Sequence, residues 1–200
     1  MPSHRSIELH LAPPLLSIFF PLLMAGVEVG VETGCSVKAL LTEQFGISAD
    51  YLSSRITTIF LNSKAVDNTA TALIHDGAIL ALSGAMPGLV GATMRSGGYY
   101  AAMRGAMTYR EEGEETGTRA GRIRLKLFNL LLEELGPRVL RRGILLSAER
   151  LQEFLTAQPD TFRPLGCWVE GRPVPIERLQ QTEFSVAPDQ QVKLQVHFGD

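Results

Sequence analysis

The sequence predicts an α+β protein built from two similar units. The first observation is a repeat: "IELHL" at residues 7–11 and "IRLKL" at 123–127 both alternate apolar and polar residues, as half-buried strands do. The second is that an apolar, proline-containing stretch follows each of them and ends at Gly26 or Gly143. The third is that a helical pattern introduced by a serine comes next in both copies. Together these observations indicate a duplication.

The first copy continues with a strand at 27–32, "VEVGVE", and a helix at 37–46, "VKALLTEQFG". Ser36 is placed to cap the first turn of this helix, and Gly46 is placed to end it. One face of the helix is apolar and is predicted to pack on a sheet: Val37, Leu40 and Leu41.

The second copy has the same elements in the same order. A strand at 144–147, "ILLS", ends at Ser147, which precedes a helix beginning "AERLQEFLT". Glu149 and Glu153 lie in its early turns, where acidic residues are favoured. The apolar stripe of this helix is Leu151, Phe154 and Leu155.

Both copies end with a strand, a tight turn and further strands. Residues 62–64 ("NSK") and 170–172 ("EGR") are of the types that tight turns prefer. Alternating runs at 79–83 and 192–196 close the two copies, with Ile79 equivalent to Val192. The residues predicted to be buried are Leu40, Leu41, Ile59, Leu61, Ile79, Leu151, Phe154, Trp168, Val192 and Leu194.

Strand, short helical connection, strand, helix, strand, turn and strand is the order of elements in a β-grasp domain, in which one helix packs across a mixed sheet. We therefore predict two tandem β-grasp units, at 5–85 and 122–200. Residues 86–121 are predicted to join them as a glycine-rich apolar arm followed by a charged connector, "REEGEETGTRAGR".

Each copy resembles the ubiquitin-like sulfur carriers, namely the small subunit of molybdopterin synthase and the sulfur carrier of thiamine biosynthesis. The resemblance lies in "IRLKLFNLLLEELG", "TGCSVKALLTEQFG" and "LNSKAVDNTATALIHDGAILALSGAMPG". It implies the ubiquitin-like fold, a link to sulfur or molybdenum-cofactor metabolism, and a partner enzyme that receives a C-terminal diglycine activated as a thiocarboxylate.

The reactive end of that family has no counterpart at the end of this sequence. The chain finishes "VHFGD", and its one diglycine is internal, at Gly97-Gly98. We therefore expect the intact chain to be inactive as a carrier and to act as a non-catalytic interaction or adaptor module. The alternative is a sulfur carrier that is activated after processing at Gly97-Gly98.

Composition limits the other functions. A net charge of −2 gives no field that attracts nucleic acid, so no nucleic-acid partner is expected. Two cysteines, Cys35 and Cys167, do not make a disulfide framework, and a reduced cytoplasmic protein is expected. The apolar run at 11–27 contains three prolines, so we expect a core segment and no membrane partner, with an export signal as the open alternative.

The sequence contains no motif for catalysis or for a cofactor. His4, His10, His75 and His197 are scattered without metal-ligand spacing, so neither a metal nor an enzyme activity is predicted. Cys35 precedes a helix, where a thiol pKa can fall, but no base is near it in sequence. Both cysteines are therefore expected to be structural.

The arm is the candidate site. Between Ser83 and Met107 the chain has no acidic residue and is rich in glycine, methionine and tyrosine. Such side chains give an adaptable contact surface, and we expect them to bind a partner protein, a second copy or a small ligand between the two units, or to pack within the chain. We expect a loop to Gly98, then a helix, with most of the arm sheltered from solvent. The candidate contact residues are Met86, Leu89, Val90, Met94, Gly97, Gly98, Tyr99, Tyr100 and Met103.

Overall fold

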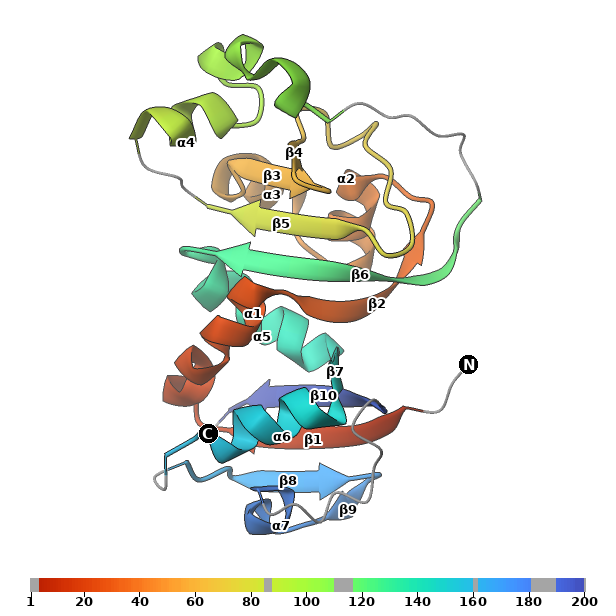
Figure 1. Cartoon of the computed structure of the whole chain (residues 1–200), viewed down its shortest axis with the longest axis vertical. Helices are drawn as coiled ribbons and strands as arrows, with labels where there is room; N and C mark the ends of the chain where they lie inside the picture. The colour runs from red at the N-terminus through yellow and green to blue at the C-terminus, as the bar shows by residue number, and fades with distance from the viewer. Residues whose placement is uncertain (1–3, 85–87, 110–116, 160–161, 181–189, 200) are drawn as a thin grey trace. The chain divides into compact units, whose positions relative to one another are not determined.

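The protein is a mixed α/β chain whose contacts divide it into two units (Figure 1). The computed structural model describes residues 4–84, 88–109, 117–159, 162–180 and 190–199. The terminal unit combines residues 1–20 with 136–200, and the central unit comprises residues 21–135. Within the described ranges, no helix has both the length and the apolar character needed to cross a membrane.

The central unit contains five neighbouring strands of the sheet, in the order β4-β3-β5-β6-β2. Its strands are β2 (Val27–Thr33), β3 (Thr58–Leu61), β4 (Lys64–Ala65), β5 (Ile79–Ser83) and β6 (Arg119–Phe128). Strands β5 and β6 run parallel, and the other neighbours run antiparallel. The helices in this part of the chain are α1 (Phe20–Ala25), α2 (Val37–Ala39), η2 (Leu40–Gln44), α3 (Ala49–Arg55), α4 (Gly88–Met94), η3 (Tyr99–Met107) and α5 (Leu131–Arg142), which crosses the division between the units.

The terminal unit contains strands in the order β7-β10-β1-β8-β9. These strands are β1 (Arg5–Leu11), β7 (Ile144–Ser147), β8 (Gly166–Val169), β9 (Arg172–Pro173) and β10 (Gln191–Phe198). Its helices are η1 (Pro13–Phe19), α6 (Ala148–Thr156) and α7 (Ile176–Gln180). Strands β1 and β10 run parallel, and β8, β9 and β7 pair antiparallel with their neighbours. Starting from the short hairpin, the five strands of each unit therefore have the same pattern of strand directions.

The strands that open the two repeats pair outside their own repeat. Strand β1, which opens the first repeat, pairs with β8 and β10 of the second. Strand β6, which opens the second, pairs with β2 and β5 of the first. In each unit, one central strand therefore comes from the other repeat. The boundaries 5–85, 86–121 and 122–200 stay a prediction.

Local signals in the sequence position most of the helices and turns. The hydroxyl of Ser36 accepts a hydrogen bond from Ala39 N at 3.1 Å, and that of Ser147 accepts one from Arg150 N at 3.2 Å. Ser36 is thus confirmed as a cap, and Ser147, which was predicted only to precede its helix, caps that helix too. The predicted helix at 37–46 is one α-helical turn followed by a π-helix at 40–44, and it ends at Gly46 with φ +63°.

The two tight turns predicted at 62–64 and 170–172 are also confirmed. Asn62 and Ser63 have φ of 49° and 66°, and Glu170 and Gly171 have φ of 51° and 73°. Two successive residues with positive φ give the backbone twist that a two-residue hairpin needs. The residues at 62–64 and 170–172 therefore form hairpin turns, which link β3 to β4 and β8 to β9.

Seven of the ten predicted core residues are buried: Leu40, Leu41, Ile59, Leu61, Leu151, Val192 and Leu194. The prediction was wrong for Ile79, which is 36 % exposed, because Leu80 and Leu82 occupy the inward positions of β5. It was also wrong for Phe154 and Trp168, which are half-buried. Trp168 alternates along β8 with buried Cys167 and so faces outward, whereas Phe154 lies at the margin of α6 against Phe19, with ring centroids 5.0 Å apart.

Candidate functional site

The arm consists of two helical segments joined by a turn. Helix η3 begins at Tyr99, so the predicted helix after Gly98 is confirmed. Helix α4 occupies residues 88–94, where a loop was predicted, so that part of the prediction was wrong. Met86 and the side chains of Leu89 and Val90 lie outside the described residues.

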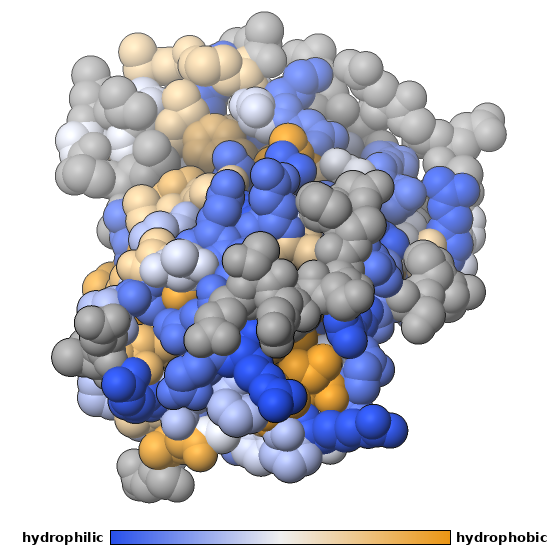
Figure 2. All heavy atoms as spheres, turned by 60° about the horizontal axis from the view of Figure 1, so that its bottom comes forward, coloured by the Kyte–Doolittle hydropathy of each residue, from blue (hydrophilic) through white to orange (hydrophobic). Residues whose placement is uncertain are grey.

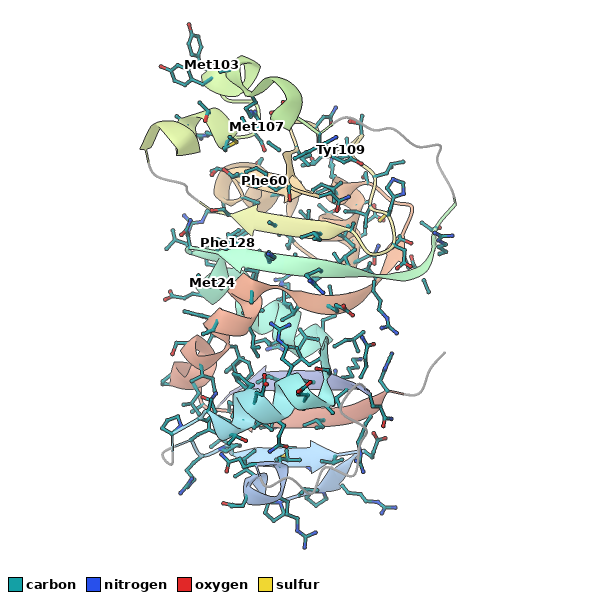
Figure 3. The ribbon with its side chains drawn as sticks, viewed as in Figure 1. Met24, Phe60, Met103, Met107, Tyr109 and Phe128 are labelled. Atoms are coloured by element: carbon teal, nitrogen blue, oxygen red, sulfur yellow. The ribbon has the colours of Figure 1, made fainter. Side chains whose placement is uncertain are left out.

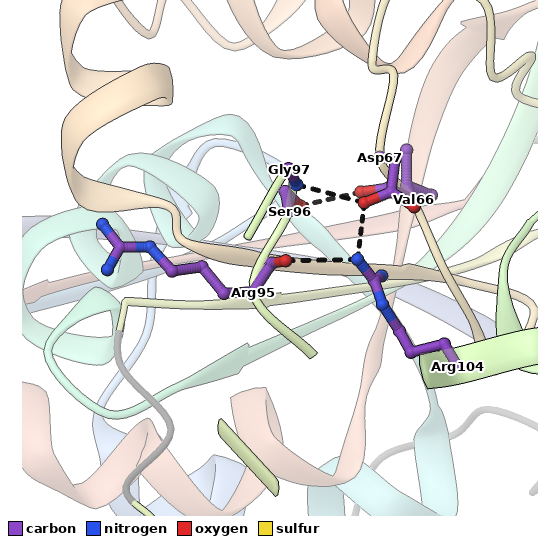
Figure 4. A network of polar contacts seen from close by, with 6 residues as sticks. All are labelled: Val66, Asp67, Arg95, Ser96, Gly97 and Arg104. Carbon is purple, nitrogen blue, oxygen red and sulfur yellow. Dashed lines mark hydrogen bonds and ion pairs between the residues drawn. The ribbon is translucent and has the colours of Figure 1, made fainter. Parts of the chain in front are cut away.

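A buried ion pair fastens η3 to the central unit (Figure 4). Arg104 has a fully buried side chain, and its Nη2 donates to Asp67 Oδ1 at 2.6 Å and to the carbonyl oxygen of Arg95 at 3.2 Å. Its Nε and Nη1 have no hydrogen-bond partner among the described residues. Because a buried guanidinium is unfavourable without a counter-charge, Asp67 is needed to keep Arg104 in this position.

The turn between the two helices is attached at the same place. Ser96 N donates to the carbonyl oxygen of Thr57 at 2.9 Å, and Ser96 Oγ donates to that of Val66 at 2.7 Å. Gly97 N donates to Asp67 Oδ1 at 3.1 Å, so this one carboxylate oxygen binds both the turn and Arg104.

The diglycine has a structural explanation in this turn. Gly97 has φ +62°, a left-handed conformation that glycine adopts without strain. A Cβ on Gly98 would lie 3.2 Å from the carbonyl oxygen of Arg95, which leaves little room for any side chain. Both glycines therefore fit a compact, hydrogen-bonded turn.

The far end of the arm continues the sheet edge. Tyr109 N donates to the carbonyl oxygen of Ala65 at 2.8 Å, and Thr108 forms a parallel bridge with Ala65 of β4. The short hairpin β3–β4 would otherwise present an open edge at Ala65. The arm is thus held at three places: the Ser96–Gly97 turn, Arg104 and residues 108–109.

The outer side of η3 carries large apolar side chains in solvent. Tyr99 is 92 % exposed, Met103 70 %, Met107 49 % and Tyr100 41 %. The rings of Tyr99 and Tyr100 meet edge to face, with centroids 5.1 Å apart. We call these four residues the arm surface. For these four side chains the expectation that the arm is sheltered is not met in the single chain, whereas Arg104 of the same helix is buried.

Other apolar side chains follow the arm surface on the central unit. Figure 3 marks Met103 and Met107 on η3, then Tyr109 and Phe60, then Phe128 and Met24 toward α1. Tyr109 is bonded to Ala65, which lies opposite Phe60 across the β3–β4 hairpin. Phe60 and Phe128 are half-buried and Met24 is exposed. On the face seen in Figure 2, by contrast, hydrophilic side chains predominate and the coloured hydrophobic ones form small separate groups.

A pocket lined by both polar and apolar side chains borders the turn. It has a volume of about 590 Å³ and is lined by residues of α2 and α3 together with the turn. Its charged lining residues are Lys38, Asp50, Asp67 and Arg95. Charges of both signs line it, so the pocket does not select an anion or a cation.

The two cysteines have the properties of structural residues. Burial raises the pKa of the Cys167 thiol to about 12. Burial also raises the pKa of the Cys35 thiol, although Cys35 precedes α2 and its Sγ accepts a hydrogen bond from Gln44 Nε2 at 3.4 Å. A nucleophilic cysteine needs a lowered pKa, so neither residue has the electrostatics of a catalytic thiol.

One cluster was missed by the sequence analysis. Glu8 and His10 of β1 and His197 of β10 lie together on the terminal unit, although the sequence places the histidines far apart. The i, i+2 spacing of Glu8 and His10 on a strand puts both on one face and was a usable signal. The approach of His197 could be found only by knowing that β1 lies beside β10.

Comparison of the chain with protein-family models, curated proteins and solved structures gave no match.

Proposed function

We propose that this protein is a non-catalytic interaction module of the ubiquitin-like, tandem β-grasp type, and that the arm surface is where a partner protein binds. The observation that carries the proposal is the exposure of Tyr99, Tyr100, Met103 and Met107 on a segment that is fastened by buried polar contacts. Tyrosine and methionine supply large contact areas, and methionine adapts to differently shaped partners.

The fastening of the arm favours binding. A free apolar segment would have to be ordered when it binds, and this loss of conformational entropy would weaken the complex. Here Asp67 holds both Arg104 and Gly97, so η3 is already in place. The central unit carries further apolar side chains, the half-buried Phe60 and Phe128 and the exposed Met24. An apolar surface of this kind on a fixed element is typical of a protein-binding site.

The link to sulfur or molybdenum-cofactor metabolism rests on the sequence resemblance alone. The processed-carrier alternative requires cleavage after Gly98, within a turn where Ser96 and Gly97 make three hydrogen bonds to Thr57, Val66 and Asp67. A protease acts on exposed, mobile chain, so this turn favours the intact module over the processed carrier.

Site-specific cross-linking tests the proposal. A photo-reactive phenylalanine analogue replaces Met103 in the full chain and is activated in the cells that make the protein. The matched control carries it at Leu165, which is 61 % exposed and belongs to the terminal unit. We expect one dominant adduct of defined mass from position 103 and none from position 165. Equal, diffuse labelling from both positions would contradict a partner site on the arm.

A second measurement separates the module from the carrier. The intact mass of the protein from the same cells is expected to be that of the full chain. A species ending at Gly98 would instead support the processed carrier.

A further inference from the structure

We propose that Glu8, His10 and His197 form a binding site for one divalent transition-metal ion of the zinc class. Glu8 Oε1 lies 2.7 Å from His10 Nε2 and 3.6 Å from His197 Nε2. One ligand atom from each residue can be chosen so that all three atoms lie within 4.8 Å of one another. Both imidazoles thus present the same nitrogen to the same carboxylate oxygen.

The sheet brings these three groups together without any loop. Strands β1 and β10 are parallel neighbours, and His10 is the register partner of His197. Buried Leu9 and Val196 alternate with these histidines, so both rings stand on the outer face of the sheet. Glu8 lies two residues before His10 and therefore shares that face. Side chains on sheet strands are positioned more precisely than side chains on loops, as a metal site requires.

The spacing suits a tetrahedral ion. Zn²⁺ binds histidine nitrogen and carboxylate oxygen at about 2.0–2.2 Å, so two ligand atoms of a tetrahedral site lie about 3.3 Å apart. The two separations from Glu8 Oε1, 2.7 Å and 3.6 Å, fall on either side of this value. Movements of about half an ångström or less would bring each histidine nitrogen to this separation from Glu8 Oε1. The three side chains are between 37 % and 42 % exposed, which leaves the fourth position to water.

The donor set indicates which ions the site takes. Two imidazoles and one carboxylate suit Zn²⁺ and its neighbours in the first transition row, whereas Mg²⁺ and Ca²⁺ prefer sites made of oxygen ligands alone. The site would join β1 to β10 across two segments that are remote in sequence, and metal binding would therefore stabilise the terminal unit.

The ring of Trp168 packs against that of His10, and its fluorescence can report metal binding. The ring centroids of His10 and Trp168 are 4.5 Å apart, and those of His10 and His197 are 5.0 Å apart. The indole lies across Gly166, where a Cβ would be 2.2 Å from the Trp168 ring, so glycine is needed there for the ring to take this position. Trp168 is the sole tryptophan of the chain, so its fluorescence reports on this site.

The experiment is a titration of the metal-free full-length protein with Co²⁺, followed by Trp168 fluorescence and by the visible absorption of the cobalt ion. We expect saturable quenching at one ion per chain, the strong visible bands of four-coordinate cobalt, and reversal of both signals by Zn²⁺. His10→Ala and His197→Ala should each weaken binding by at least about tenfold, and Glu8→Gln should weaken it as well.

His4→Ala and His75→Ala are the matched controls, because each removes a histidine outside the cluster and should change the affinity by less than about twofold. Thermal unfolding without metal shows whether each variant is folded, and His10→Gln replaces any variant that is not. An affinity that is unchanged in His197→Ala, or quenching that does not saturate at one ion, would overturn the proposal. A rise in the unfolding temperature with Zn²⁺ in the parent protein and not in His197→Ala would support it.

Discussion

Nη2 of Arg104 lies 2.6 Å from Oδ1 of Asp67, and this contact joins the arm to the segment that follows the β3–β4 hairpin. The arginine side chain is fully buried and the aspartate side chain is one-third exposed. The guanidinium of Arg104 is therefore desolvated, and removing the Asp67 carboxylate would leave it as a buried charge without a counter-charge.

We predict that Asp67→Asn releases the arm from the central unit. The neutral amide leaves the buried guanidinium without a counter-charge, a loss of about 3 kcal/mol, at the lower end of the range for buried pairs because Asp67 is partly exposed. The loss should appear as local opening. Hydrogen exchange should accelerate at Ser96, Gly97 and Tyr109, with β5 and β6 unchanged.

The double variant Asp67→Asn with Arg104→Met is the control for this prediction. Replacing both charges with neutral groups of similar size removes the uncompensated guanidinium, so part of the protection should return. Equal exchange in the single and double variants would show that the ion pair does not hold the arm.

Local signals in the sequence were sufficient where the responsible contacts are local. Ser36 was recognised as a cap because a cap depends on only three or four residues. The turn at 62–64 was recognised for the same reason. Ile79 was assigned to the wrong face because "ILALS" is apolar at four of its five positions, so alternation does not fix its phase.

Contacts between distant segments could not be predicted. The pairing of β1 with β10, and of β6 with β2, depends on which strands meet after the chain has collapsed. Because the two repeats have similar strand patterns, each opening strand could pair with strands of either repeat, and the side chains it would meet are similar in both cases. The approach of His197 to His10 follows from the pairing of β1 with β10. No local sequence pattern indicates that these two histidines meet.

In β5 the buried face is the opposite of the one predicted, and this can be tested with two neighbouring substitutions. Leu80 is fully buried, whereas Ile79, beside it on the same strand, is 36 % exposed. Leu80→Ala should lower the free energy of unfolding by about 2–5 kcal/mol, because it removes buried apolar contacts and leaves a cavity. Ile79→Ala should lower it by about 1 kcal/mol or less. Chemical denaturation of both variants checks this, and equal losses would contradict the assigned faces.

A polar cluster between α3 and α5 should make the free energy of unfolding depend on pH in the acidic range. Glu134 accepts hydrogen bonds from Arg55 and from the Tyr51 hydroxyl, and these contacts lower the pKa of Glu134 from its ordinary value of 4.5. The contribution is therefore complete above pH 4.5 and is lost as the pH falls through the lower pKa of the folded state.

We predict that Glu134→Gln is less stable than the parent protein at pH 7 and that the difference disappears at low pH. Denaturation curves at a series of pH values measure it. Tyr51→Phe is the control, because it removes one donor and keeps the ion pair between Glu134 and Arg55. A difference that persists unchanged down to the lowest pH at which the parent protein stays folded would contradict this role for the carboxylate.

The thiol of Cys167 should make the free energy of unfolding depend on pH in the alkaline range. Its pKa is raised by burial from 9.0 to about 12, so the unfolded chain ionises at a lower pH than the folded one. The neutral thiol therefore favours the folded state fully below pH 9, and this contribution is lost as the pH rises from 9 toward 12. The stability of the parent relative to Cys167→Ala should fall across this interval.

Thiol labelling gives an independent measure of the same burial. In the folded protein, iodoacetamide should react slowly with half-buried Cys35 and not with Cys167, and both should react after unfolding. Peptide mass spectrometry distinguishes the two sites. Rapid labelling of Cys167 in the folded state would show that β8 opens readily.

The last prediction concerns the opening strands of the repeats. Ile7 of β1 and Ile123 of β6 occupy equivalent places in the two repeats, and each is almost completely buried. Ile7 lies opposite Leu194 and Val169, whereas Ile123 lies opposite Val29. Ile7→Ala should therefore accelerate hydrogen exchange in β8 and β10 and leave β2 and β5 protected. Ile123→Ala should do the reverse, because an alanine at either position weakens the sheet that contains it. Each variant serves as the control for the other, since both replace the same side chain at the same burial. If Ile7→Ala accelerated exchange in β2, the opening strand would pair within its own repeat in solution.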